Sequence, residues 1–366
     1  MDPLKAQQLT LATVDVFLSV EEQILINVAK RLKSGKKLLN EDINSWQLEK
    51  LQQLESLTQA NVFTIAKHSG MAINEVSKML EKAGYLAVDE NEADLVEAVQ
   101  KGKLIETIPV AQSVALQNVL TAYQQQARDT FNLVNSTILS QSRQVYLDII
   151  NQTVGKVLSG VSTPQEALRE TAAKWAEKGV PALIDKRGRQ WSAEAYISAV
   201  TRSMSNNIAN EMQEARMDEY GADLIEVSSH SGARPGCAPY QGRVFSRSGN
   251  HPKYKPLSST SYGRPEGLKG VNCGHLFYPF IEGITDRTYR PVKKAENDEA
   301  YKESQQQRYL ERRIRQAKRE LEMMGAMGDD IGIGMAKKKV KDRQADMRSF
   351  INSTGRTRRR DREQVY

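Results

Sequence analysis

The chain has 366 residues and a formal net charge of +7; 39% of its residues are hydrophobic, 6% are aromatic and 27% are charged. This composition favours a helical, extended or assembly-forming protein of two or three structural units over a compact enzyme with one large core. No run of about 18 apolar residues exists, so no membrane-spanning helix is expected, and two cysteines are too few for a secreted disulfide framework, which favours a reducing compartment.

The N-terminal hundred residues are predicted to be helical. Apolar side chains at helical spacing predict an amphipathic helix over residues 4–34. Residues 40–100 are expected to form several shorter helices, with breaks at the glycine-containing pairs 69–70 and 84–85.

Longer helices are predicted in the next hundred residues. Between Pro109 and Gly160 apolar residues recur at steps of three, four or seven, which indicates one long helix or a broken pair. The sequence Thr163-Pro164-Gln165-Glu166 predicts a helix start, because Thr caps, Pro takes the first helical position and Glu completes a capping box. A further helix is expected from Ser192 through Arg216.

The character of the sequence changes at Gly221. Alternating or apolar stretches predict strands at 223–229, 242–246 and 272–281, and the segments between them are rich in Gly, Pro and Ser. This pattern predicts a small α+β module.

A charged helix and a basic tail are expected after this module. Apolar residues repeat at steps of four and three up to a predicted stop at Gly325, which suits either a single docked helix or a coiled coil; they are Leu310, Ile314, Ala317, Leu321 and Met324. Residues 328–334 are expected to be a flexible link. Residues 337–366 contain eleven Lys or Arg and four acids, an excess of seven that equals the whole net charge, and are expected to be disordered until bound.

The predicted fold is therefore mainly α with a small α+β module. An extended helical N-terminal region, a Cys/His-stapled module and a disordered basic tail follow one another along the chain. The expected regions are 1–105 (N-terminal helical), 106–220 (long helix), 221–284 (Cys/His α+β module), 285–327 (C-terminal helix) and 328–366 (flexible basic tail).

Both cysteines and three of the four histidines lie between residues 230 and 275. A structural zinc site needs four N or S ligands, often supplied as close pairs from separate segments. Cys273 and His275 are two residues apart on a predicted strand and so share one face, and His230 with Cys237 supplies a second pair. The sequence thus predicts a structural zinc ion held by His230, Cys237, Cys273 and His275. A disulfide between the cysteines, or two unrelated buried cysteines, remain open alternatives.

An enzymatic alternative uses the same residues. A catalytic zinc ion keeps one position for water and has a carboxylate base nearby, so a zinc-dependent nuclease or other DNA-processing enzyme would use Glu226 or Glu282. Nothing in the spacing favours these acids over solvated ones on a strand face. We therefore expect no catalytic residues and no enzyme activity.

A second alternative is a helix-turn-helix regulator. Ala66, Gly70 and Val76 have the relative spacing of that motif within residues 65–80. A plain helical hairpin gives the same pattern, and Glu75 and Glu81 would face phosphates unfavourably.

The basic tail is predicted to contact DNA through its phosphates, without sequence specificity and with strong salt dependence. The predicted contact residues are Lys337, Lys338, Lys339, Arg358, Arg359 and Arg360. Arg234 and Arg243, in the loops of the module, could also contact DNA or a partner, but a role in surface solubility alone is favoured for them. A tail without any role is the alternative.

The residues that frame the Cys/His window carry a resemblance to a known family. They read His230-Ser-Gly-Ala-Arg-Pro-Gly-Cys237-Ala-Pro-Tyr-Gln241-Gly242-Arg-Val-Phe245, then Tyr262-Gly263, then Gly267-Leu-Lys-Gly270-Val-Asn272-Cys273-Gly-His275, and finally Phe280-Ile-Glu-Gly283. This segment resembles the phage minor capsid protein 2 family, relatives of the Mu F-like head-morphogenesis proteins.

The resemblance implies a structural minor capsid protein of a tailed phage. It implies association with the portal and capsid proteins, a place in the virion at the capsid interior or portal vertex, and a role in head assembly and DNA packaging or ejection. Assembly would take place in the cytoplasm of the bacterial host, and the partner inside the head would be phage genomic DNA. The resemblance also makes the Cys/His set a stapling element rather than a catalytic one.

Overall fold

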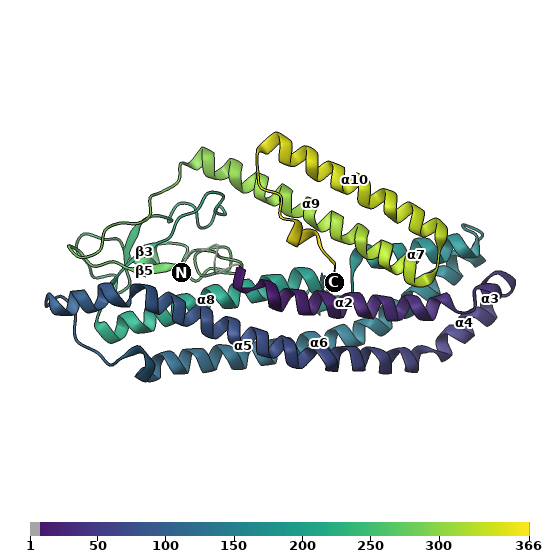
Figure 1. Ribbon diagram of the computed structural model, residues 1–366, viewed down its shortest axis with the longest axis horizontal. Coiled ribbons are helices and arrows are strands. Elements are labelled where there is room, and N and C mark those ends of the chain that lie inside the picture. The colour runs from purple at the N-terminus through teal and green to yellow at the C-terminus, as the bar shows by residue number, and fades with distance from the viewer. Residues whose placement is uncertain (1–7, 366) are drawn as a thin grey trace. The chain divides into compact units, whose positions relative to one another are not determined.

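A computed structural model of the chain describes residues 8–365 (Figure 1). Long helices dominate it, and the strands are short. In chain order the elements are α2 (Leu11–Lys33), α3 (Lys36–Glu41), α4 (Ile43–Gln52), α5 (Leu54–Gln100), η1 (Val110–Gln112), α6 (Val114–Leu158), α7 (Pro164–Lys178), β1 (Pro181–Ile184), β2 (Gln190–Ser192), α8 (Ala193–Tyr220), β3 (Leu224–Val227), β4 (Val244–Ser246), η2 (Leu257–Ser259), β5 (Phe277–Pro279), α9 (Lys294–Met327), α10 (Asp330–Thr354) and η3 (Arg360–Glu363). The predicted fold class, mainly α with a small α+β module, is confirmed.

The chain forms two compact units, each drawn from three separate stretches. Unit 1 comprises the residues up to Val14, Ile73–Thr130 and Ser198–Ser304. Unit 2 comprises Asp15–Ala72, Phe131–Ile197 and Gln305–Tyr366. This division differs from the five consecutive regions expected from the sequence, because long helices such as α5 contribute residues to both units.

Several predicted helices are present with close to the expected bounds. Helix α2 covers most of the predicted range 4–34, whose first four residues lie outside the described part of the chain, and α6 is one unbroken helix. The predicted capping box begins α7: Glu166 Oε2 accepts the backbone N–H of Thr163 at 3.2 Å and its hydroxyl at 2.7 Å.

The predicted breaks between residues 40 and 100 are wrong in one respect: α5 runs without interruption through residues 69–70 and 84–85. A single glycine inside a helix costs only about 1 kcal/mol relative to alanine, which the packing of a long helix can offset. Gly70 faces open space, whereas Gly84 faces Met212 of α8 so closely that no side chain fits between them. The helix-turn-helix alternative is also wrong, because residues 65–80 lie within α5 and contain no turn.

A β-hairpin in unit 2 was missed by the sequence reasoning. Strands β1 and β2 pair antiparallel, with Leu183 opposite Trp191. The turn between them is held by Asp185, whose Oδ1 accepts the backbone N–H groups of Arg187 at 2.9 Å and Arg189 at 3.0 Å. Strands of four and three residues are too short to leave a clear alternating pattern in the sequence.

The three strands predicted between residues 223 and 281 are confirmed as an antiparallel sheet in unit 1. The strand order is β4-β3-β5, with Ile225 opposite both Phe245 and Pro279. Buried side chains of the sheet pack with Leu95 and Ala98 of α5 and with Met217 of α8. The sheet is therefore small and depends on helices for its core.

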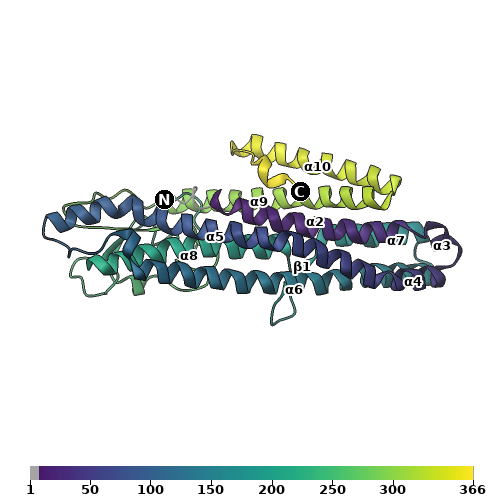
Figure 2. The ribbon, with the colours of Figure 1, turned by 60° about the horizontal axis from the view of Figure 1, so that its bottom comes forward.

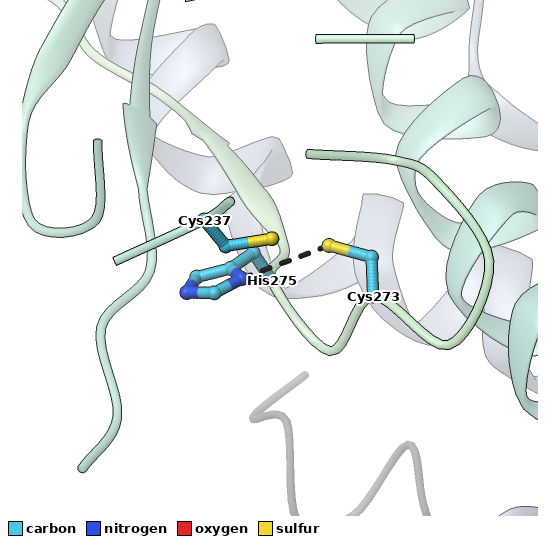
Figure 3. Close-up of side chains that lie close together, drawn as sticks. All are labelled: Cys237, Cys273 and His275. Atoms are coloured by element: carbon cyan, nitrogen blue, oxygen red, sulfur yellow. Dashed lines mark hydrogen bonds between the residues drawn. The ribbon is translucent and has the colours of Figure 1, made fainter. Parts of the chain in front are cut away.

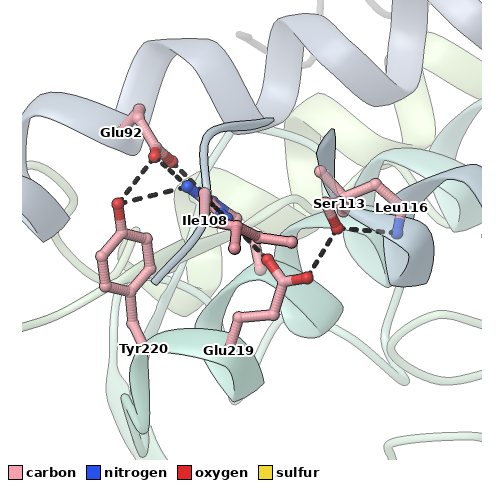
Figure 4. A network of polar contacts seen from close by, with 7 residues as sticks. Glu92, Ile108, Ser113, Leu116, Glu219 and Tyr220 are labelled. Atoms are coloured by element: carbon pink, nitrogen blue, oxygen red, sulfur yellow. Dashed lines mark hydrogen bonds and ion pairs between the residues drawn. The ribbon is translucent and has the colours of Figure 1, made fainter. Parts of the chain in front are cut away.

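A buried polar network also holds unit 1 together (Figure 4). The guanidinium group of Arg216 in α8, 1% exposed, donates to both carboxylate oxygens of Glu92 in α5, to Glu219 Oε2 at 2.6 Å and to the carbonyl of Ile108 at 2.9 Å. Ser113 donates to Glu219 Oε1 at 2.6 Å and accepts the backbone N–H of Leu116 at 3.1 Å, so it caps α6. The network links α5, α8 and the start of α6.

Helices α9 and α10 lie side by side in both views (Figures 1 and 2). The predicted apolar seam of α9 is used for docking: Ile314 and Leu310 pack against Met347 of α10. The helix passes through Gly325, the predicted stop, and ends at Met327. None of the helices within residues 8–365 has a stretch long and apolar enough to cross a membrane.

The expectation of a flexible, disordered tail is corrected for residues 330–354, which form α10. Asp329 caps this helix by accepting the backbone N–H of Gly332 at 3.2 Å, and the guanidinium group of Arg169 binds both of its carboxylate oxygens, at 2.6 and 3.0 Å. Met347 is fully buried. A cap, an ion pair and an apolar face outweigh the charge repulsion that made the segment look disordered.

Candidate functional site

Two loops of unit 1 carry the Cys/His site, one between β3 and β4 and one between β4 and β5. They approach each other closely at Gly236, where an added Cβ would lie 2.2 Å from the carbonyl oxygen of Glu266. Arg234 joins the same two loops: its guanidinium group donates to the carbonyls of Gly267 and Val271, and its Nε lies 3.3 Å from Cys237 Sγ. This arrangement brings Cys237 to the segment that contains Cys273.

Three of the four predicted ligands converge in the interior (Figure 3). Cys237 is 0% exposed, Cys273 4% and His275 1%. One ligand atom from each lies within 4.8 Å of the others, and Cys273 Sγ is 3.6 Å from His275 Nδ1. Both cysteines are free thiols.

Gln241 determines which nitrogen of His275 faces the sulfur atoms. Its Oε1 accepts the backbone N–H of His230 at 3.0 Å, which fixes the amide orientation because a backbone N–H can only donate. The same oxygen lies 3.4 Å from His275 Nε2. In the neutral imidazole, Nε2 therefore carries the proton and Nδ1 presents its lone pair to Cys273.

A second set of hydrogen bonds holds Gln241 and the backbone of His275 in place. Asn297 Oδ1 accepts from Gln241 Nε2 at 3.3 Å and from the backbone N–H of Ala233 at 2.8 Å. Asn206 and Asn210 of α8 donate to the carbonyl of His275 at 2.9 and 3.1 Å. The His275 ring and backbone are thus held by three different segments of unit 1.

The pKa values of the two thiols are shifted in opposite directions. The hydrogen bond with Cys273, together with burial, raises the pKa of Cys237. The hydrogen bond from Cys237 lowers the pKa of Cys273 against the effect of burial, and contact with His275 lowers it further. The more acidic of the two is thus Cys273, the cysteine in contact with His275, and a thiolate is the form of cysteine that binds soft metal ions.

His230, the fourth predicted ligand, lies beside the three converging residues but outside their group of ligand atoms. Its ring is tilted against that of His275 with centroids 4.5 Å apart. His251 lies elsewhere, against Tyr254 with centroids 5.0 Å apart. The structure thus brings Cys237, Cys273 and His275 together and leaves His230 adjacent to them.

Neither acid of the enzymatic alternative belongs to this group. Glu226 is buried and accepts the backbone N–H groups of Thr288 and Tyr289, both at 3.0 Å. Glu282 is bound by Lys253 and Tyr254 at the surface. Both carboxylates have structural partners, and neither is placed as a base beside the sulfur atoms.

The sequence reasoning missed the supporting residues Gln241 and Asn297. It expected Arg234 to be a solvated surface residue or a contact with DNA or a partner, whereas its guanidinium group binds two loop carbonyls and lies against Cys237 Sγ. The signal available for Gln241 was its place next to Gly242 in the family-like motif. Asn297 lies on α9, 22 residues after His275 in the chain, and no local pattern links it to the site.

The predicted DNA-contact residues fall into two groups. Lys337 and Lys338 of α10 are exposed, as is Arg360 of η3, and Arg359 is half-buried. Lys339 forms an ion pair with Glu320, and Arg358 binds both carboxylate oxygens of Glu363. Part of the basic segment is therefore neutralised by the protein itself.

A cavity of about 270 Å³ lies among these basic residues in unit 2, lined by Lys318, Gln344, Arg348, Arg358, Arg360, Glu363 and Gln364. Its lining holds four cations and one acid, and that acid is engaged by Arg358. Burial lowers the pKa of Lys318, and Arg358 and Arg315 lower it further against the attraction of Glu363. The cavity thus has a surplus of positive charge.

Comparison with known proteins gives two relatives and one family. A structural protein of Lactococcus phage LL-H is 28% identical over 370 residues, which cover 96% of this chain and 98% of the relative. A structural protein of Lactococcus phage mv4 is 28% identical over 116 residues, which cover 31% of this chain and 94% of the relative. No solved structure matches the chain.

The family match extends well beyond the Cys/His window that carried the resemblance. It is to phage minor capsid protein 2 and spans residues 1–352, which include both units and nearly all of α10. The chain therefore belongs to the phage minor capsid protein 2 family.

Proposed function

We propose that this minor capsid protein associates with the portal, works inside the phage head during DNA packaging or ejection, and contacts the packaged DNA through its C-terminal segment. The observation that carries the DNA contact is the cavity whose lining includes Lys318, Arg348 and Arg360, three cations for which no ion pair with a carboxylate is found among residues 8–365. Cations that lie close together are stabilised by an anion, and the phosphodiester group is the anion that fills a phage head.

The exposed face of α10 supports the same proposal. Lys337, Lys338 and Lys341 are exposed, and no partner is found for them among residues 8–365. Each cation that neutralises a phosphate releases counterions, so binding would be non-specific and would weaken steeply with salt. Inside a filled capsid the DNA concentration is very high, and even weak contacts of this kind would be occupied.

The portal association is supported by the family to which the chain belongs and by the abundance of long helices, which offer extended surfaces for other head proteins. In this proposal the protein joins the portal and capsid proteins in the host cytoplasm and becomes enclosed in the head as it matures.

The DNA contact is tested by measuring the affinity of the purified protein for a short duplex as a function of salt concentration. Removing two exposed lysines in the double variant Lys337→Gln/Lys338→Gln should reduce the slope of log K against log salt by about two. Arg348→Gln/Arg360→Gln should lower affinity in the same way. The matched control is Lys67→Gln/Lys82→Gln, which removes two exposed lysines of α5. Equal effects in all three variants would show that only net charge matters and would contradict a C-terminal DNA contact.

The placement in the head is tested separately with virions. Intact particles and particles emptied of DNA are treated with protease, and the protein is followed by mass spectrometry. We expect protection in intact particles, and co-purification with portal rings from lysates that lack the major capsid protein. Cleavage in intact particles would place the protein outside the head, and a portal preparation without the protein would contradict the association.

A further inference from the structure

Three buried residues of unit 1 bring their donor atoms together. One ligand atom each from Cys237, Cys273 and His275 lies within 4.8 Å of the others, and the nitrogen that lies 3.6 Å from Cys273 Sγ is His275 Nδ1. Two of the donors are sulfur and one is an imidazole nitrogen whose lone pair is directed inward by the Gln241 hydrogen bond at Nε2. These are the donors that zinc prefers, whereas magnesium and calcium require oxygen.

We propose that unit 1 binds one zinc ion through Cys237 Sγ, Cys273 Sγ and His275 Nδ1, and that the ion holds the two loops of the α+β module together. This inference is independent of the proposed role in the head, since it concerns how the module is stabilised. It narrows the sequence-based ligand set from four residues to three and names the coordinating atom of the histidine.

The surroundings resemble those of structural zinc ligands. A zinc-binding histidine almost always donates its other N–H to a fixed acceptor, which sets the tautomer and the ring orientation. Here that acceptor is Gln241, which is itself held by Asn297 at 3.3 Å. The charge is also balanced: two thiolates neutralise a divalent ion, and Arg234 Nε supports Cys237 Sγ at 3.3 Å.

The position of the site in the chain explains what the ion would do. The sheet contains strands of only four, three and three residues. Cys237 lies in the β3–β4 loop and Cys273 lies 36 residues later in the β4–β5 loop. A metal ion bound by both cysteines would link the two ends of this long irregular segment. Because the site does not exist in the unfolded chain, the free energy of metal binding would add to the free energy of folding.

Burial indicates a structural rather than a catalytic ion. All three ligands are less than 5% exposed, and no carboxylate belongs to the group. Three protein ligands leave one position of a tetrahedral ion, and the His230 ring lies against that of His275, with centroids 4.5 Å apart. The case for a structural ion therefore rests on the burial of all three ligands and on the absence of a carboxylate from the group.

The test uses the full-length protein, purified without chelator, with zinc measured by plasma emission spectrometry. We expect about one zinc ion per chain, and loss of the metal in Cys273→Ser and His275→Ala. The matched control is His251→Ala, which removes another histidine of the same module and should leave the zinc content unchanged. Replacement of zinc by Co²⁺ should give the thiolate-to-cobalt charge-transfer band and the visible bands of a tetrahedral site.

A variant that fails to fold would also lose zinc, so the wild-type protein provides the second measurement. Chelation should lower the thermal unfolding temperature, and added zinc should restore it. Wild-type protein that contains no zinc, gives no cobalt spectrum and is unaffected by chelator would overturn the proposal. A Cys237–Cys273 disulfide in the freshly purified protein, seen as the loss of two hydrogens by mass spectrometry, would overturn it as well.

Discussion

Gly84 of α5 faces Met212 of α8 so closely that a Cβ atom on Gly84 would lie 2.1 Å from Met212 Sδ. Met212 is fully buried, so it cannot swing away into solvent. Gly70, in the same helix, has nothing within 4 Å of its Cβ position. Gly84 therefore permits close contact between α5 and α8, whereas the effect of Gly70 is only to lower the helix propensity of α5.

These two glycines should therefore respond in opposite ways to the same substitution. Gly70→Ala should raise the free energy of unfolding by about 0.5–1 kcal/mol through helix propensity. Gly84→Ala should lower it by about 1–3 kcal/mol, because overpacking outweighs that gain. Urea unfolding measured by circular dichroism compares them. If Gly84→Ala is as stable as Gly70→Ala, the close approach to Met212 is not present in solution.

The Arg216 network should be one of the most sensitive polar sites in unit 1. Arg216→Met leaves the carboxylates of Glu92 and Glu219 without their shared cation, and removing one partner of a buried pair costs about 3–5 kcal/mol. Lys101→Met, which breaks the exposed ion pair with Glu97, should cost less than about 1 kcal/mol. Thermal unfolding of both variants provides the comparison, and similar losses would argue against the network.

Glu92 should make stability depend on pH. Burial opposes its ionisation, but hydrogen bonds from Arg216 and Tyr220 hold its pKa below the ordinary value of 4.5. A lowered pKa in the folded state contributes stability that is fully present above 4.5 and is lost as pH falls through the folded-state pKa. Unfolding free energies measured from neutral pH down to about pH 3 should fall less steeply in Glu92→Gln than in the wild type. The matched control is Glu97→Gln, which removes an exposed acid of the same helix; an equal change of slope in both variants would contradict the role of the Arg216 network.

The docking of α10 can be tested by limited trypsin digestion. Met347→Asp places a charge in the apolar contact with Leu310 and Ile314, and should release the helix and expose its many Lys and Arg bonds to cleavage. Met335→Asp is the control, because Met335 lies on the same helix and is 59% exposed. Rapid cleavage of the wild-type segment would mean that residues 330–354 are not packed as described.

His230 should affect zinc binding less than His275 does. Because its ring lies against His275 outside the group of three donors, His230→Ala should retain zinc but bind it about 10–100-fold more weakly. Competition with a chromophoric chelator measures this difference. A loss as complete as that of His275→Ala would make His230 a full ligand, and an unchanged affinity would exclude it from the site.

Much of the architecture was predictable because it follows from local chemistry. The Thr163–Glu166 capping box, the apolar periodicity of α6 and the alternating stretches of β3 and β4 are all encoded within a few residues of one another. The convergence of Cys237, Cys273 and His275 was also predictable in outline. The chain has only two cysteines, and a shared site is the simplest reason for both to lie within the same short stretch of sequence as three of its four histidines.

The errors arose where a local signal was outweighed by distant contacts. Gly84 predicts a helix break, but α8 packs against it and α5 continues through it as one helix. The segment after Gly328 reads as disordered, yet Arg169 and Leu310, far away in the sequence, provide an ion pair and an apolar surface for α10.

The sequence by itself determined the helical class, the small strand module and the family to which the chain belongs, because periodicity, capping and motif order are properties of neighbouring residues. Only the tertiary structure decided that His275 presents Nδ1 rather than Nε2, that Arg234 faces inward and that the basic segment forms a packed helix. Each of these depends on a partner such as Gln241, Val271 or Leu310. Such partners lie near in space but far along the chain, and no local pattern records them.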